Sequence, residues 1–94
     1  MFTIGVNSTG TIVMTGRFDA SQTDRAREVL SRLNDSAIVD FGGLEYISSA
    51  GLGVLLATQQ RLNKEGKKIK IVKMNSMIRD VFKIARFDLI FEID

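Results

Sequence analysis

The stretch "EYISSAGLGVLL", residues 45–56, places two serines and two glycines where an apolar helical run begins. The spacing of Leu52 and Leu55 predicts a helix that starts near the serines. A serine at the N-cap accepts a hydrogen bond from a backbone N–H group two or three positions on, a role that fits Ser48. Ser49 is then expected to open the first turn, with its hydroxyl facing solvent. Glycine inside a helix costs about 1 kcal/mol relative to alanine. Gly51 and Gly53 therefore need a separate explanation.

Two explanations of the glycines remain open from the residues alone. Glycines leave the backbone bare, so that another molecule can approach it closely. The start of a helix also carries partial positive charge and unpaired N–H groups, which favour a phosphate or another anion. The alternative is a plain serine cap combined with tight packing. Neither Ser48 nor Ser49 is followed three residues later by Glu or Gln, so the sequence contains no capping box.

The segments before this helix predict strands and one further helix. "FTIGV" (2–6) alternates apolar and smaller residues, and "TIVMTG" (11–16) follows a turn, so the two are expected to form an antiparallel hairpin. Ser21, three residues before Asp24, predicts the start of a helix. "AIVDF" (37–41) is mostly apolar, and we expect a central strand buried on both faces.

The remaining elements alternate in type. After the strand at 37–41 we expect a loop over "GGLEYI" (42–47) and a helix over 49–64 that Gly66 ends. A strand over "KKIKIVK" (67–73), a helix capped by Asn75 or Ser76, and a last strand within "DLIFEID" follow. This order predicts an α/β fold with a mixed sheet, an N-terminal antiparallel hairpin and right-handed parallel β-α-β crossovers packed with helices.

Composition limits the classes of function. The chain has 94 residues, the size of one domain spanning 1–94, with 45% hydrophobic and 26% charged residues. It contains no cysteine and no histidine, so it lacks thiolate chemistry, the most common general base and the most common metal ligand. No apolar run approaches the roughly 20 residues that cross a bilayer. We therefore expect a cytoplasmic binding or signalling domain that is not an enzyme, does not insert into membranes, and needs no metal or cofactor.

The basic residues gather late in the chain, in "NKEGKKIKIVK" (63–73), although the net charge is only +2. A groove for nucleic acid would place aromatic side chains among such charges, and none occurs between Tyr46 and Phe82. We therefore expect no nucleic-acid binding. The lysines are predicted to form the solvated face of an amphipathic strand; they are Lys67, Lys68, Lys70 and Lys73.

The segment "VDFGGLEYISSAGLGVLL" (39–56) resembles the signature of the STAS domain, the fold of bacterial anti-anti-sigma factors. In that family a strand and a short loop lead to D-S-[ST/A]-G-L-G at the start of a helix. "TGRFDAS" (15–21) is also similar to the family's G-x-[LIV]-D segment after the second strand, which places the acidic residue at Asp19. The resemblance covers the whole chain in the order of its elements.

The resemblance implies specific roles for residues of this chain. The phosphoacceptor of the family falls on Ser49, and the acidic residue that precedes it in the family falls on Ser48, which is a departure from the pattern. Asp19 is expected either to shape the site or to cap a loop. The partner-binding residues that the resemblance implies are Asp19, Ser48, Ser49, Ala50, Gly51 and Gly53.

The resemblance also implies a switch. The unphosphorylated antagonist binds an anti-sigma factor that is itself a serine kinase of the histidine-kinase-like ATPase type, which frees sigma factor. Phosphorylation by that kinase releases the antagonist, and a metal-dependent serine phosphatase resets it. The protein is then expected to be a monomer when free. The alternatives are a STAS subunit of another assembly, such as a stressosome scaffold or a lipid-transport complex component, or a STAS domain that binds a small anion at the same helix start.

Overall fold

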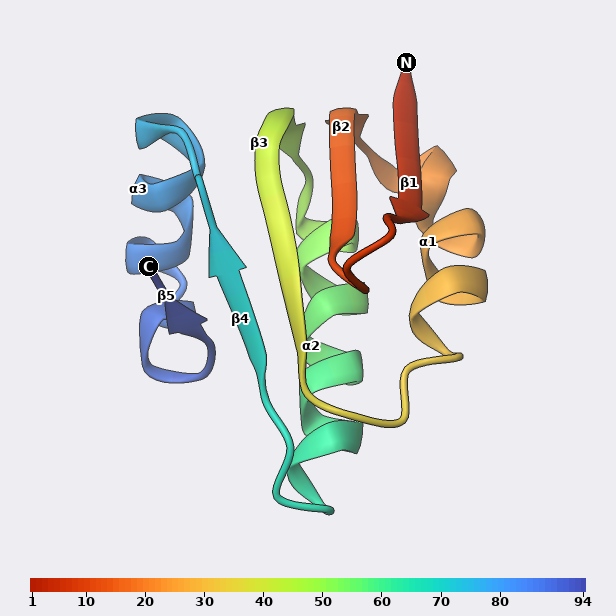
Figure 1. The fold of residues 1–94 in the computed structure, drawn as a ribbon. Coiled ribbons are helices and arrows are strands. Elements are labelled where there is room, and N and C mark those ends of the chain that lie inside the picture. Colours follow the sequence, from red (N-terminus) through yellow and green to blue (C-terminus); the bar gives the residue numbers. More distant parts are fainter.

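The computed structural model describes residues 1–94 and contains one five-stranded sheet in the order β1-β2-β3-β4-β5 (Figure 1). The strands are β1 (Phe2–Val6), β2 (Ile12–Phe18), β3 (Ala37–Ile47), β4 (Ile69–Val72) and β5 (Glu92–Ile93). The helices are η1 (Ala20–Gln22), α1 (Thr23–Leu30), α2 (Ser49–Asn63), α3 (Ser76–Ile84) and η2 (Phe87–Leu89). β1 and β2 pair antiparallel, whereas β3, β4 and β5 each pair parallel with the preceding strand. The predicted α/β fold with an N-terminal hairpin is confirmed.

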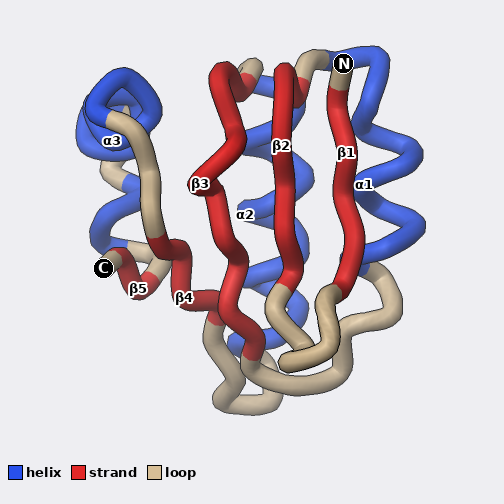
Figure 2. Tube along the Cα trace, turned by 45° about the horizontal axis from the view of Figure 1, so that its top comes forward, coloured by secondary structure: helices blue, strands red, loops and turns tan.

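Helices cover only one face of the sheet. α1 and α2 lie behind it, α3 lies beside β4, and the front face carries no helix (Figures 1 and 2). The prediction that 37–41 is buried on both faces is therefore wrong. Val39 and Phe41 are fully buried beneath the helices, but Ile38 points to the uncovered face and is 44% exposed. The helix over 49–64 is confirmed to within one residue, with Leu55 fully buried.

β3 is longer than the sequence predicts. Residues 42–47, expected to be a loop, continue the strand to Ile47 and pair with the second half of β2. Leu44 and Ile47 are buried in the core, and pairing with β2 keeps this segment in the strand. A Cβ atom at Gly43 would lie 2.8 Å from Cγ2 of Thr15, so glycine lets the two strands approach closely.

The first helical segment also differs from the prediction, which placed its start at Ser21. A 3₁₀ turn, η1, precedes α1, and the side chain of Asp19 caps this turn by accepting from the N–H of Ser21. α1 itself begins at Thr23. The carboxylate thus takes the capping role that the sequence suggested for the serine.

The last predicted strand, within "DLIFEID" (88–94), is much shorter than expected, because Asp88 and Leu89 belong to the 3₁₀ turn η2 and a turn and a bend follow at residues 90 and 91. Only Glu92–Ile93 pairs with β4. The rings of Phe87 and Phe91 lie 5.8 and 5.9 Å from the ring of Phe82 on α3. This aromatic packing folds the segment back on α3 before it can join the sheet.

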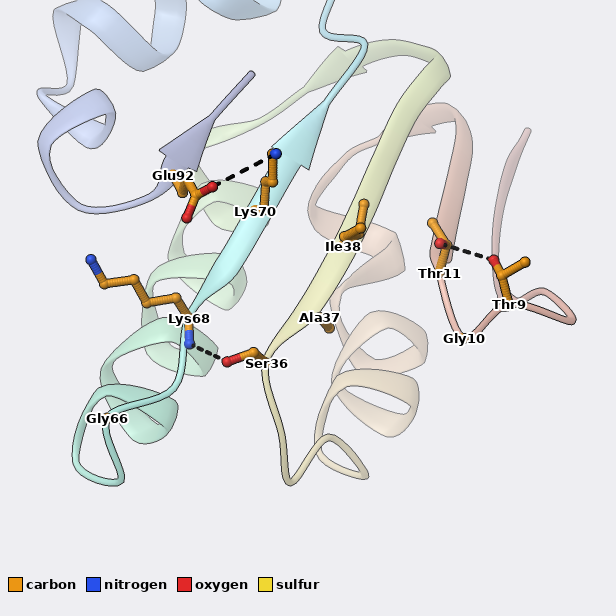
Figure 3. Close-up of a pocket in the computed structure, with 10 residues that line it drawn as sticks. All are labelled: Thr9, Gly10, Thr11, Ser36, Ala37, Ile38, Gly66, Lys68, Lys70 and Glu92. Carbon is orange, nitrogen blue, oxygen red and sulfur yellow. Dashed lines mark hydrogen bonds and ion pairs between the residues drawn. The ribbon is translucent and has the colours of Figure 1, made fainter.

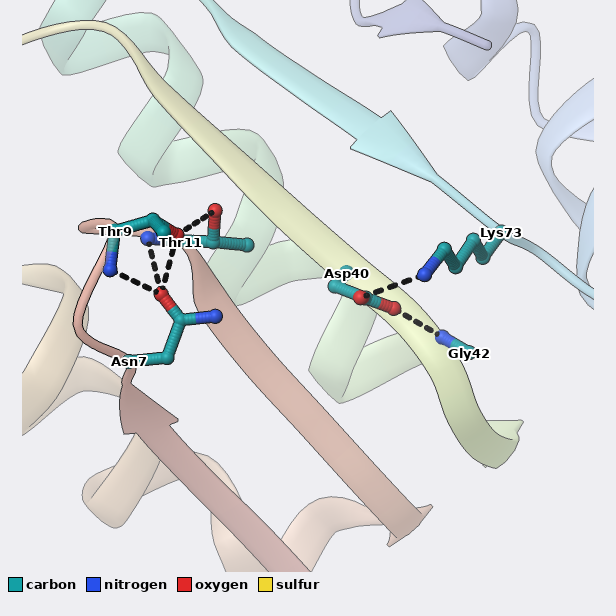
Figure 4. Close-up of polar contacts among 6 residues, drawn as sticks. All are labelled: Asn7, Thr9, Thr11, Asp40, Gly42 and Lys73. Carbon is teal, nitrogen blue, oxygen red and sulfur yellow. Dashed lines mark hydrogen bonds and ion pairs between the residues drawn. The ribbon is translucent and has the colours of Figure 1, made fainter.

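Polar side chains make contacts in the hairpin turn and between β3 and the start of the β4–α3 connection (Figure 4). The side-chain oxygen of Asn7 accepts from the N–H groups of Thr9 and Thr11, both at 3.0 Å, and from the Thr9 hydroxyl at 2.7 Å. On the uncovered face, the carboxylate of Asp40 lies 3.6 Å from the ammonium of Lys73, which has a positive φ of 62°. Asn7 thus holds the hairpin turn, while Asp40 joins β3 to the residue that follows β4 through a partly exposed ion pair.

The four lysines near β4 are less uniformly solvated than predicted. Lys68 and Lys73 are exposed, whereas Lys67 and Lys70 are half-buried. The Lys67 ammonium donates to the carbonyl oxygen of Asn34 at 2.6 Å, because the α2–β4 loop lies against the loop that precedes β3.

Candidate functional site

The candidate site lies at the carboxyl ends of β2 and β3. These strands run parallel, so Phe18 and Ile47 end at the same edge of the sheet, at the upper end in Figure 1. The N–H of Ser48 donates to the carbonyl of Phe18 at 2.9 Å, which joins the segment after β3 to the end of β2. η1 packs against α2. The structure therefore brings Asp19 and the two serines to one edge, where open α/β sheets usually bind their ligands.

Ser48 caps α2. It has extended backbone angles (φ −86°, ψ 168°), and its hydroxyl oxygen accepts from the N–H of Gly51 at 3.1 Å. Its carbonyl accepts the first hydrogen bond of the helix, from the N–H of Leu52 at 2.9 Å. The prediction that Ser48 caps this helix is confirmed. The hydroxyl of Ser48 is thus engaged with the backbone.

Ser49 is the first residue of α2 and is exposed. Its hydroxyl makes no hydrogen bond within the chain, in contrast to that of Ser48. The first turn of α2 contains no acidic residue. The partial positive charge and unpaired N–H groups of the helix start are therefore not offset by a carboxylate of that turn. Of the two hydroxyl groups, only that of Ser49 is open to a reaction partner without loss of a cap.

The two glycines of the first turns have different reasons to be glycine. Gly51 is buried, and a Cβ atom there would lie 3.0 Å from Cγ1 of Ile47 and 3.1 Å from Cγ of Phe18. The interpretation of Gly51 as bare backbone open to a partner is therefore wrong, because strand side chains already fill that space. Gly53 is exposed, and a Cβ atom there would meet nothing within 4 Å. Only Gly53 keeps the surface beside the serines low.

Asp19 lies next to this surface, and its carboxylate is occupied by local contacts. One carboxylate oxygen accepts from the hydroxyl of Ser21 at 2.6 Å and from its N–H at 3.0 Å. These two hydrogen bonds, with smaller contributions from the charges of Arg17 and the N-terminus, hold the pKa of Asp19 below its ordinary value of 3.8. The capping role that the sequence left open for Asp19 is confirmed. Ala50, in the first turn of α2, is half-buried.

Two contacts near the site were not found from the sequence. The side-chain amide of Asn75, which caps α3, also donates to the carbonyl of Leu44 at 3.1 Å and so ties the start of α3 to β3. The guanidinium of Arg17 stacks over the ring of Tyr46 at 4.3 Å. Residues 17 and 46 are register partners on β2 and β3, so this pair would have been predicted if residues 42–47 had been recognised as a strand.

Nothing in the site assembles a metal centre, because no group of three or more His, Cys, Asp or Glu side chains lies close enough to hold an ion. None of the helices is both long enough and apolar enough to cross a membrane.

Comparison with known families identifies the fold. The family model described as "Mlab, STAS domain" matches residues 5–92. The chain belongs to the STAS domain family. A STAS-domain containing protein of Pseudomonas aeruginosa is 27% identical over 86 residues, which cover 88% of this chain and 85% of the relative.

A second relative and one solved structure extend the comparison. The "Putative anti-sigma factor antagonist BtrV" of Bordetella bronchiseptica is 36% identical over 56 residues, which cover 60% of this chain. The STAS chain aligns with about half of that relative, 48% of its length. The structure of the Bacillus cell fate determinant SpoIIAA in the phosphorylated form superposes with a TM-score of 0.72 at 18% identity, covering 100% of this chain and 91% of that one. The STAS fold predicted from the serine-glycine segment is thus confirmed.

Proposed function

We propose that this STAS domain is an anti-sigma factor antagonist that phosphorylation of Ser49 switches off. The observation that carries the proposal is that the two adjacent serines have different structural roles. Ser48 holds the cap of α2, while Ser49 presents an exposed and unbonded hydroxyl at the positive end of the same helix. A relative whose name describes an anti-sigma factor antagonist and the fold shared with phosphorylated SpoIIAA support it.

The switch acts on binding and leaves folding intact. A phosphate on Ser49 adds about −1.5 to −2 charges at neutral pH. The N-terminus of α2 favours that charge, and no carboxylate of the first turn opposes it. At an interface the phosphate must be desolvated, and it then repels a partner that lacks basic groups to receive it. Phosphorylation therefore releases the partner while the domain stays folded.

The proposed partner is an anti-sigma factor that is also a serine kinase, of the histidine-kinase-like ATPase type, and a serine phosphatase resets the switch. We place the contact on Asp19, the serine pair, Ala50 and the low surface at Gly53; Gly51 supports this surface from below through its packing on Phe18. The domain acts as a substrate and binding module, without catalysis of its own, and as a monomer when free. These roles match a site that offers one unbonded hydroxyl, that of Ser49, at a helix start.

One observation favours a second candidate function. Ser48 stands where the family pattern has an acidic residue, so a kinase that reads that carboxylate would lose a contact. The second candidate is a STAS subunit of another assembly, such as a stressosome scaffold or a lipid-transport complex, in which the same edge of the sheet binds a partner without phosphorylation.

Affinity capture from the native lysate separates the two functions. The tagged domain should retain a kinase-like ATPase, and Ser49→Asp should release it because the added charge mimics the phosphate. Ser76→Asp, at the start of α3, is the matched control and should retain the partner. Capture of membrane-transport subunits or other STAS proteins, with no kinase-like ATPase, would contradict the first function and support the second.

A further inference from the structure

A hollow lies on the uncovered face at the end of the sheet opposite Ser49. Its volume is about 530 Å³, within the range of pockets that hold small molecules. Four segments line it: the β1–β2 turn, the start of β3, the α2–β4 loop with β4, and β5 (Figure 3). This hollow shares no residue with the proposed phosphorylation site.

One wall of the hollow supplies positive charge and a hydrogen-bond donor. The ammonium of Lys68 has no ion-pair or hydrogen-bond partner, whereas that of Lys70 lies 3.7 Å from the carboxylate of Glu92. The hydroxyl oxygen of Ser36 accepts from the backbone N–H of Lys68 at 3.0 Å, which leaves the hydroxyl proton for a ligand. The Lys68 side chain points away from Ser36 and Ile38 in Figure 3, so its ammonium reaches a ligand in the hollow only after a rotamer change, which exposed side chains make within nanoseconds. The two lysines outnumber the carboxylate of Glu92 on this wall, so its net positive charge favours an anionic group.

The opposite wall supplies only acceptors. The hydroxyl of Thr9 donates its proton to the side chain of Asn7 at 2.7 Å. Because that proton is committed, the 3.2 Å contact between the two threonine hydroxyls is donated by Thr11. Both threonine oxygens keep lone pairs but no proton. This wall fits the hydroxyl groups of a ligand.

The floor between the walls is apolar. Ile38 projects from β3 between the lysines and the threonines and is 44% exposed, because no helix covers this face of the sheet (Figure 3). A sugar ring can place its C–H face on such a floor while its hydroxyls and its anionic group reach the two walls.

We propose that this hollow binds a small phosphorylated sugar, with the phosphate at Lys68, Lys70 and Ser36, the hydroxyls at Thr9 and Thr11, and the ring on Ile38. Each part of the ligand is matched by a different chemical feature of the hollow. The inference is independent of the proposed switch at Ser49 and stands if that switch fails.

Titration of the ¹⁵N-labelled domain with glucose 6-phosphate, to about 10 mM, tests the proposal by NMR. We expect saturable shifts at the amides of Ser36, Ile38 and Gly66, and weaker binding of both inorganic phosphate and glucose. Lys68→Gln should lower the affinity about tenfold, the loss of roughly one charge-assisted contact. Lys64→Gln, which removes an exposed lysine outside the hollow, should leave it unchanged.

Three results would overturn the proposal. They are the absence of saturable shifts, an equal loss of affinity in Lys64→Gln and Lys68→Gln, and binding of inorganic phosphate as tight as that of the sugar phosphate. The last two would show attraction of anions to a basic surface and no site built for a hydroxylated ligand.

Discussion

At the residue scale, the adjacent serines and glycines of α2 look alike in the sequence and differ in the structure. Ser48 bonds the backbone and Ser49 does not; Gly51 is packed and Gly53 is open. The sequence correctly predicted that Ser48 caps this helix, but it could not say why each glycine is present. The space around a Cβ atom depends on Phe18 and Ile47, which reach the helix only in the folded sheet.

The glycine pair gives the sharpest stability prediction at this scale. Gly51→Ala should lower the free energy of unfolding by about 1–3 kcal/mol, because its methyl group must displace the Phe18 ring or Ile47. Gly53→Ala should raise it by about 0.5–1 kcal/mol, since the helix gains a better helix former in open space. Urea unfolding of both variants measures the difference. Equal effects of the two substitutions would contradict the packing account.

Removal of the cap has a separate expected result. Ser48→Ala should lower the free energy of unfolding by about 0.5–2 kcal/mol, because the N–H of Gly51 loses its acceptor. Ser49→Ala should change it by less than about 0.5 kcal/mol, since its hydroxyl bonds nothing in the chain. Thermal unfolding followed by circular dichroism compares them, and a greater loss in Ser49→Ala would reverse the assignment of the cap.

Asp19 predicts part of the pH dependence of stability. Its folded-state pKa lies below its ordinary value because Ser21 donates two hydrogen bonds to the carboxylate. The carboxylate therefore stabilises the fold above about pH 4, and this contribution is lost as the pH falls through the folded-state pKa. Asp19→Asn should show a smaller drop in urea midpoint between about pH 6 and pH 3 than the parent protein. Asp80→Asn, at an exposed position without polar contacts, should show the same decrease in urea midpoint as the parent protein. An equal decrease in all three proteins would contradict the proposed contribution of Asp19 to stability.

At the element scale, the errors of the sequence prediction lie where tertiary packing overrides local signals. Gly42 and Gly43 suggested a loop, but pairing with β2 extends β3 to Ile47. "DLIFEID" predicts a strand, but only Glu92–Ile93 pairs with β4, and the rings of Phe87 and Phe91 pack on Phe82 of α3. The hairpin, α2 and the cap of α3 were predicted correctly, because each depends on local alternation, helical spacing or a capping residue.

Gln59 links two elements through the core and gives the prediction at this scale. Its side chain is fully buried on α2; its oxygen accepts from the N–H of Ile69 at 2.7 Å, and its nitrogen donates to the carbonyl of Lys67 at 3.3 Å. Gln59→Leu should lower the free energy of unfolding by about 1–3 kcal/mol, because it leaves the buried N–H of Ile69 without an acceptor. Gln60→Leu, at the exposed neighbouring position, should change it by less than about 0.5 kcal/mol. Chemical denaturation of the pair decides whether Gln59 anchors the start of β4.

At the scale of the whole molecule, the domain has two separate polar regions at opposite ends of one sheet. The edge at the carboxyl ends of β2 and β3 carries the serine pair, and the other end of the uncovered face carries the basic hollow. The first region could be predicted from the sequence, because serines and glycines at the start of an apolar helical run form a local pattern. It did not locate the second, since the hollow is built by four segments that only the sheet topology brings together.

The central claim is that Ser49 is the phosphoacceptor of this STAS domain. Its most direct test is phosphopeptide mapping by mass spectrometry after incubation with the captured kinase and ATP, on the parent protein and on Ser48→Ala and Ser49→Ala. We predict phosphate on Ser49 in the parent and in Ser48→Ala, and none in Ser49→Ala although that variant remains folded. Phosphate on Ser48 alone, or on neither serine, would contradict the claim.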